Sequence, residues 1–156
     1  MEEIDDKDQG EVYQVTTFPV RFNLGEIKEN FTINTNISSK PSKEQIIKQA
    51  FEFHSEGNIS EASKYYQYFI NQGFKDHRVF SNYGSILKDL AKLKEAEILT
   101  RKAINLNPNF SNAHYNLGNI LSDLGKLKEA ERSYREAIQI KPDFAEAHFN
   151  LGNIMK

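Results

Sequence analysis

Cysteine and tryptophan are absent from the 156 residues of this chain, which contains only four prolines and two methionines. Without cysteine the chain has no disulfide, thiolate nucleophile or cysteine-ligated zinc site. No stretch approaches the roughly 18 consecutive apolar residues that a membrane helix needs. The acidic N-terminus lacks the basic start and apolar core of a secretory signal. We therefore expect a cytoplasmic protein that does not cross a membrane.

Excess charge is also small, because the net charge is -2 although 27% of the residues are charged. Electrostatics therefore gives no reason to expect a nucleic acid or a membrane surface as the partner. The charge is uneven: residues 1–42 contain eight acidic and four basic residues, so residues 43–156 carry a net charge of about +2. We predict two parts, an acidic segment 1–42 that is partly disordered or extended, and a second part 43–156.

Catalytic motifs are missing as well. The sequence contains no HExxH, no glycine-rich phosphate loop and no nucleophile elbow. His114 and His148 occupy equivalent positions of a repeat, so we interpret them as packing residues. We expect no catalytic residue, no metal ligand and no cofactor, and thus a protein that is not an enzyme.

What the chain contains instead is an internal repeat of 34 residues. HYNLGNI begins at His114 and HFNLGNI begins at His148. The same spacing links further columns of small and aromatic residues: Ala50, Gly84, Gly118 and Gly152; Ala62, Ala96 and Ala130; Tyr66, Thr100 and Tyr134; Phe69, Ala103 and Ala137; and Pro108 with Pro142. We predict repeats at residues 43–76, 77–110 and 111–144, followed by a partial copy at 145–156.

Each copy is predicted to form two antiparallel helices, because its apolar residues recur at helical spacing. Ser42 is placed to cap the first helix, and Pro108 and Pro142 end the second helices. Gly57 and Gly125 stand at the turn between paired helices, where left-handed backbone is favoured, and Ala91 takes that position in the second copy. The column of small residues at 50, 84, 118 and 152 lets the paired helices approach closely.

The pattern resembles the tetratricopeptide repeat, with the matching residues Leu117-Gly118, Leu121, Ala130, Tyr134, Ala137 and Pro142 in the third copy. The first copy departs most, with Gln49-Ala50 and Phe74 at the positions of the Leu-Gly pair and the proline. The resemblance implies an all-α fold, a right-handed α-solenoid of antiparallel helix pairs preceded by an irregular N-terminal segment. It also implies a non-catalytic scaffold that binds a protein or peptide in a concave groove.

In repeats of this family the first helix of each pair lines the groove. Asn82, Asn116 and Asn150 recur there at the repeat period. Asparagine carries both a donor and an acceptor, so a row of asparagines can bond the backbone of an extended peptide. Because duplicated repeats also copy residues that have no use, inheritance is the alternative explanation. The predicted binding residues are Asn82, Asn116, Asn150, Asn119, Asn153, Tyr115, Arg78 and Ser85, with Lys88 and Ser122 on the same helices.

Two further interpretations come from the family. The asparagines and the YNLGN motif resemble the repeats of O-linked N-acetylglucosamine transferases, so the chain could alternatively be the substrate-recognition segment of such an enzyme. Chaperone-binding tetratricopeptide domains instead hold a terminal carboxylate with basic residues. Glu146 and Asn150 stand where those bases are expected, so we rank this binding mode lower.

Two regions fit the repeat less well. The last copy shows Leu151, Ile154 and Met155, the apolar residues that normally meet a second helix. We expect this edge to belong to a longer array or to meet another chain, which includes self-association. Within the first part, Val20, Phe22 and Leu24, then Phe31 and Ile33, alternate with polar residues, a weak signal for two strands around Gly25.

Overall fold

The computed structural model describes residues 17–18, 31–32 and 40–155, and it divides into two units between Pro41 and Ser42. In the first unit, β1 (Thr17–Phe18) pairs antiparallel with β2 (Phe31–Thr32). Of the residues with the predicted strand pattern, Phe31 lies in β2. The others, Val20, Phe22, Leu24 and Ile33, lie outside the described residues.

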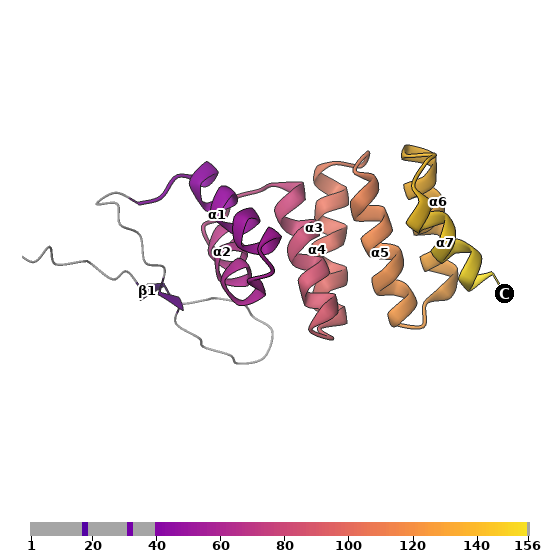
Figure 1. Cartoon of the computed structure of the whole chain (residues 1–156), viewed down its shortest axis with the longest axis horizontal. Helices are drawn as coiled ribbons and strands as arrows, with labels where there is room; N and C mark the ends of the chain where they lie inside the picture. The colour runs from indigo at the N-terminus through magenta and orange to yellow at the C-terminus, as the bar shows by residue number, and fades with distance from the viewer. Residues whose placement is uncertain (1–16, 19–30, 33–39, 156) are drawn as a thin grey trace, which may run out of the picture. The chain divides into compact units, whose positions relative to one another are not determined.

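The second unit is a row of helix pairs stacked in chain order (Figure 1). Each helix packs against its partner in the pair, and each second helix packs against the first helix of the next pair. The fold is therefore an all-α solenoid, as predicted. The helices are α1 (Lys43–Ser55), α2 (Ile59–Asn71), α3 (His77–Asp89), α4 (Leu93–Leu106), α5 (Ser111–Asp123), α6 (Leu127–Ile140) and α7 (Ala145–Ile154). None of these helices combines the length and apolarity needed to cross a bilayer.

Local signals in the sequence set the ends of these helices. Ser42 begins α1 with a capping box, in which its hydroxyl accepts from the backbone of Gln45 and the Gln45 side chain accepts from the backbone of Ser42. Helices α4 and α6 end two residues before Pro108 and Pro142, as expected for a residue without a backbone donor.

The two repeat-related histidines bind the links between pairs. His114 Nε2 donates to the carbonyl oxygen of Pro108 at 2.8 Å, and His148 Nε2 donates to that of Pro142 at 2.9 Å. Each bond joins a first helix to the link that precedes it. The two residues therefore have the structural role that the sequence predicted for them.

The turns inside the pairs have left-handed backbone. Gly57 and Gly125 have φ values of +75° and +72°, and Ala91 has the same conformation at +59°. A Cβ in this region costs about 1–2 kcal/mol, whereas the greater chain entropy of glycine costs roughly 0.5–1 kcal/mol. The second pair therefore stores strain at its turn.

Changing Ala91 to glycine should raise the free energy of unfolding by roughly 0.5 kcal/mol, because the relief of left-handed strain exceeds the entropy cost. Urea unfolding followed by circular dichroism would measure this change. Gly125→Ala is the matched control and should lower stability by a similar amount. If both substitutions moved stability in the same direction, the explanation would be wrong.

Close helix contact at the glycine column is confirmed in the second and third pairs. A Cβ on Gly118 would lie 2.5 Å from Cε1 of Tyr134, and one on Gly84 would collide with Oγ1 of Thr100. Tyr134 and Thr100 are both buried. Glycine is therefore required here because the ring or hydroxyl of the second helix occupies the space above the first.

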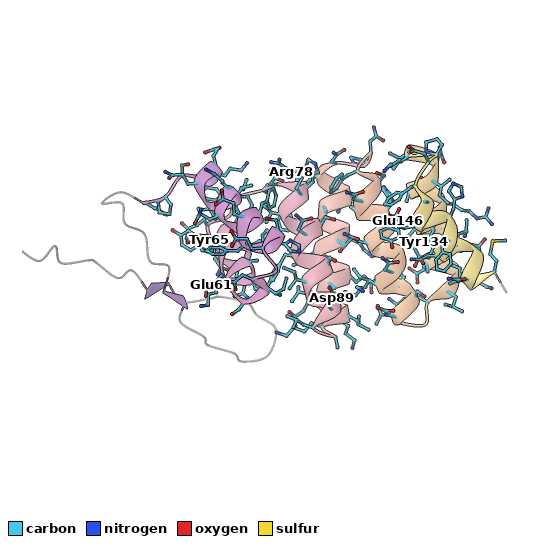
Figure 2. The ribbon with its side chains drawn as sticks, in the orientation of Figure 1. Glu61, Tyr65, Arg78, Asp89, Tyr134 and Glu146 are labelled. Carbon is cyan, nitrogen blue, oxygen red and sulfur yellow. The ribbon has the colours of Figure 1, made fainter. Side chains whose placement is uncertain are left out.

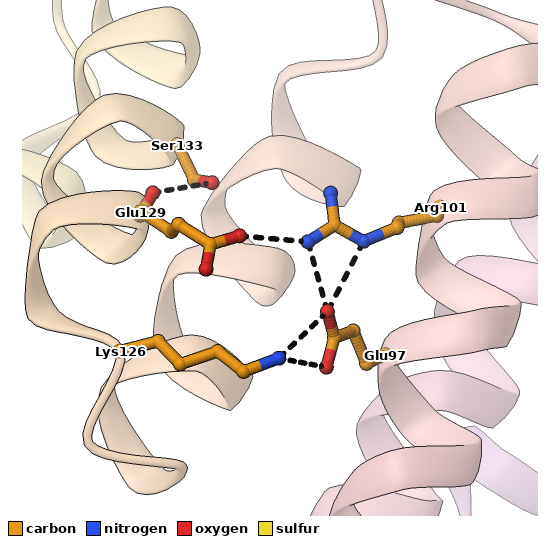
Figure 3. A network of polar contacts seen from close by, with 5 residues as sticks. All are labelled: Glu97, Arg101, Lys126, Glu129 and Ser133. Atoms are coloured by element: carbon orange, nitrogen blue, oxygen red, sulfur yellow. Dashed lines mark hydrogen bonds and ion pairs between the residues drawn. The ribbon is translucent and has the colours of Figure 1, made fainter.

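A network of charged residues links the second and third repeats (Figure 3). Glu97 accepts from Arg101 at 2.8 Å and from Lys126 at 2.9 Å, while Arg101 also pairs with Glu129 at 3.1 Å. Burial alone would raise the pKa of Glu97, but the hydrogen bonds and charges of Arg101 and Lys126 outweigh it and hold that pKa below its usual value. The carboxylate therefore joins consecutive second helices.

Candidate functional site

The solenoid has a depression of about 390 Å³ on the side of its first helices. Helices α3, α5 and α7 each contribute to it, so it crosses three successive repeats. Tyr134 reaches it from α6, among the last helices of the stack (Figure 2). We call this depression the amide groove. Its lining residues are Lys88, Tyr115, Asn119, Ser122, Asp123, Tyr134, Asn150, Asn153 and Ile154.

Two asparagine side chains form the centre of the amide groove. The Tyr134 hydroxyl donates to Oδ1 of Asn119 at 2.8 Å, and Nδ2 of Asn150 donates to the same oxygen at 2.8 Å. Nδ2 of Asn150 also lies 3.4 Å from the Tyr115 hydroxyl. Among the described residues, Asn119 Nδ2 has no acceptor and Asn150 Oδ1 has no donor. The pair thus offers one donor and one acceptor, the complement of a peptide group.

The electrostatics of the amide groove are nearly neutral. Burial raises the pKa of Tyr134 to about 12, although its hydrogen bond with Asn150 opposes this shift. The hydroxyl therefore keeps its proton at neutral pH and serves as the donor to Asn119. Lys88 is the one cationic lining residue, and its Nζ lies 3.0 Å from a carboxylate oxygen of Asp89. Asp123 is the one anionic lining residue. Nothing in this lining requires a charged ligand.

Half of the predicted binding residues meet in the amide groove, namely Tyr115, Asn119, Asn150 and Asn153. Asn82, Asn116, Arg78 and Ser85 lie outside its lining. Asn116 donates to Oγ of Ser81 at 3.1 Å, and Asn82 hydrogen-bonds with Tyr66. The asparagines of the repeat-period column therefore bind residues of a preceding helix, whatever else they contact.

Arg78 lies apart because it begins α3, whereas Lys88 is near the other end of that helix. Figure 2 shows Arg78 and Asp89 at opposite ends of α3. The Arg78 guanidinium pairs with Asp76 at 2.8 Å and stands over the ring of Phe51, 5.5 Å from its centroid. Its charge is compensated within the first two repeats.

Sequence analysis missed three lining residues, Asp123, Tyr134 and Ile154. Tyr134 could have been found, because it belongs to a column at the repeat period and stands 16 residues after Gly118. That spacing puts it opposite the glycine, where the two helices approach most closely. Asp123 and Ile154 carry no signal of this kind in the sequence.

Antiparallel helix pairs stacked in chain order define a class of proteins, the helical-repeat solenoids. Within that class the repeats are tetratricopeptide repeats. Models of the tetratricopeptide repeat match residues 77–110 and 99–132, and a model described as a TPR repeat matches residues 118–156. No curated protein matches the chain.

Several solved structures share this fold. The second TPR domain of human RPAP3, in complex with an HSP70 peptide, is 26% identical with a TM-score of 0.64, and the match covers 71% of this chain and 92% of that one. MamA is 23% identical with a TM-score of 0.68, covering 72% of this chain and 66% of that one. An O-GlcNAc transferase of Thermobaculum terrenum is 22% identical with a TM-score of 0.68, covering 72% of this chain and 22% of that one.

Proposed function

We propose that this chain is a non-catalytic interaction scaffold that binds an extended peptide segment of a partner protein in the amide groove. The observation that carries the proposal is the Asn119–Asn150 pair, which leaves one amide donor and one carbonyl acceptor for a peptide backbone. An extended backbone alternates these two groups, so it matches the pair without a particular side chain. The peptide complex of the RPAP3 domain supports a groove ligand of this kind.

The lining favours an uncharged peptide. The peptide in the RPAP3 complex, SGPTIEEVD, is acidic. In this chain the only cation of the amide groove, Lys88, is paired with Asp89, and Asp123 lines the same surface. An acidic terminus would therefore meet one compensated cation and one carboxylate, which favours segments rich in serine, threonine and asparagine over acidic ones.

The alternative, a substrate-recognition segment of an O-GlcNAc transferase-like enzyme, rests on the asparagine column and the likeness in fold. Such a segment would use Asn82, Asn116 and Asn150 as peptide contacts. Because Asn116 donates to Ser81 and Asn150 donates to Asn119, that column is partly committed to contacts between repeats. The scaffold function therefore has the better support.

The test measures binding of labelled octapeptides, capped at both ends, by fluorescence anisotropy. One set is built from uncharged polar residues, and the peptide SGPTIEEVD is compared with it. The double variant Asn119→Ala/Asn153→Ala should weaken the best uncharged peptide by roughly tenfold, because each lost hydrogen bond is worth about 0.5–1.5 kcal/mol. Chemical shifts of the asparagine side-chain amides would report direct contact.

Asn105→Ala on the exposed surface of α4 is the matched control and should leave affinity unchanged. Circular dichroism would verify that the double variant remains folded. Equal binding by wild type and the double variant would refute the amide groove as the site. Preference for SGPTIEEVD over every uncharged peptide would refute the proposed peptide class.

A further inference from the structure

Helix α7 repeats the sequence of α5 but not its burial. In α5, Leu117 and Leu121 are buried, and Leu121 is only 1% exposed. Their equivalents in α7 are Leu151, which is half-buried, and Met155, which is 62% exposed. The same apolar pattern that meets α6 in the third repeat is thus presented to solvent by α7.

The glycine column shows the same difference. In α3 and α5, a Cβ on the glycine would collide with a residue of the next helix, Thr100 or Tyr134, each 16 positions further along. A Cβ on Gly152 would meet no atom within 4 Å. The surface of α7 therefore has the socket that receives Tyr134 in the third repeat, with no described residue in it.

A charged pair adds an independent observation. Glu131 and Arg135 form an ion pair at 2.7 Å and are the repeat equivalents of Glu97 and Arg101, which pair at 2.8 Å. The earlier pair also binds Lys126 and Glu129 from the start of the next second helix (Figure 3). Among the described residues, Glu131 and Arg135 have only each other. Their outer sides can therefore accept one cation and one anion in the same geometry.

We propose that α6 and α7 form a docking surface, separate from the amide groove, for an amphipathic helix of a different protein. The partner helix carries a basic residue at its start, an acidic residue three positions later and an aromatic residue five positions after that. The basic residue pairs with Glu131, the acidic residue pairs with Arg135, and the aromatic ring covers Gly152. The apolar side of the same helix buries Leu151 and Met155.

A second copy of this chain fits the surface less well than a separate protein. Among the described helices, Lys126, Glu129 and Tyr134 at α6 carry the required pattern. All three are already engaged, because Tyr134 is buried against α5 and the other two bind the second repeat. A second copy would have to unfold its third repeat to offer this helix.

The sequence of α6 itself provides the probe. A fluorescent, capped peptide with the sequence of residues 126–141 is titrated into the full chain. We expect saturable binding that Gly152→Ala in the protein weakens by about tenfold, since the new Cβ occupies the space of the ring. Tyr134→Ala in the peptide should have an effect of the same size.

Charge exchange then tests the register. Glu131→Lys in the protein should weaken binding, and Lys126→Glu in the peptide should restore it, because the pair is then reversed. Glu136→Lys, on the same helix but outside the charged column, is the matched control and should not change affinity. Gly152→Ala has room in the unbound protein, so a folding defect does not account for its effect.

Three results would overturn the proposal. They are the absence of saturable binding, binding that neither Gly152→Ala nor Glu131→Lys alters, and sedimentation of the wild type as a dimer that Met155→Lys converts to a monomer. The last result would assign the surface to a second copy. None of these results concerns the amide groove, whose own variants, Asn119→Ala and Asn153→Ala, should leave binding of the α6 peptide intact.

Discussion

Replacing Gly118 with alanine is expected to lower the free energy of unfolding by about 1–3 kcal/mol, although alanine is the better helix former. The added Cβ would lie 2.5 Å from Cε1 and 2.6 Å from Cδ1 of Tyr134. The ring is 2% exposed, and its hydroxyl is bonded to Asn119, so it cannot move away cheaply. Urea unfolding with intrinsic tyrosine fluorescence measures the change.

Gly152→Ala is the control for this prediction. It makes the same change on the equivalent position of α7, where no atom lies within 4 Å of the new Cβ. Without a clash, the helix propensity of alanine should raise stability by up to about 1 kcal/mol. Equal effects of the two substitutions would mean that helix propensity, rather than contact with Tyr134, governs this column.

Replacing Tyr66 with alanine should have the largest effect, a loss of about 3–5 kcal/mol, because it empties the core of the first repeat. Tyr66 is fully buried, and its ring lies 6.1 Å from that of Phe51 and 5.8 Å from that of Tyr83. Its hydroxyl hydrogen-bonds with Nδ1 of His54 at 3.0 Å. Tyr66 therefore joins α1, α2 and α3, and hydrogen exchange should show loss of protection in those helices.

Tyr66→Phe separates the ring from the hydroxyl. It keeps the aromatic contacts and removes the bonds to His54 and Asn82, so we expect a loss of only about 0.5–1.5 kcal/mol. If the phenylalanine variant were as unstable as the alanine variant, the hydrogen bonds, rather than ring packing, would dominate at this position.

Much of the fold could be predicted because its signals are local. The spacing of Gly84, Gly118 and Gly152 defines the repeat. Positions such as Ser42 and Pro108 mark where helices begin and end, and Gly125 marks a turn. Each of these effects acts within one or two turns of helix, so a single sequence is enough to detect it.

The candidate site was only partly predictable because its contacts join residues about 30 positions apart. The sequence put Asn119 and Asn150 on first helices but contained no sign that they bind each other. It likewise gave Arg78 the same standing as Tyr115, although Arg78 pairs with Asp76 at the far end of α3. These partners depend on how far each repeat is shifted and rotated against its neighbour.

The amino-acid sequence by itself determined that this protein is a stack of tetratricopeptide helix pairs, where the pairs begin and end, and which residues lie on the first helices. Only the tertiary structure decided which asparagines meet in the amide groove and that Gly152, unlike Gly118, has an empty surface above it. The reason is physical: periodicity and capping depend on neighbours in the chain, whereas a groove and a socket depend on how separate helices pack.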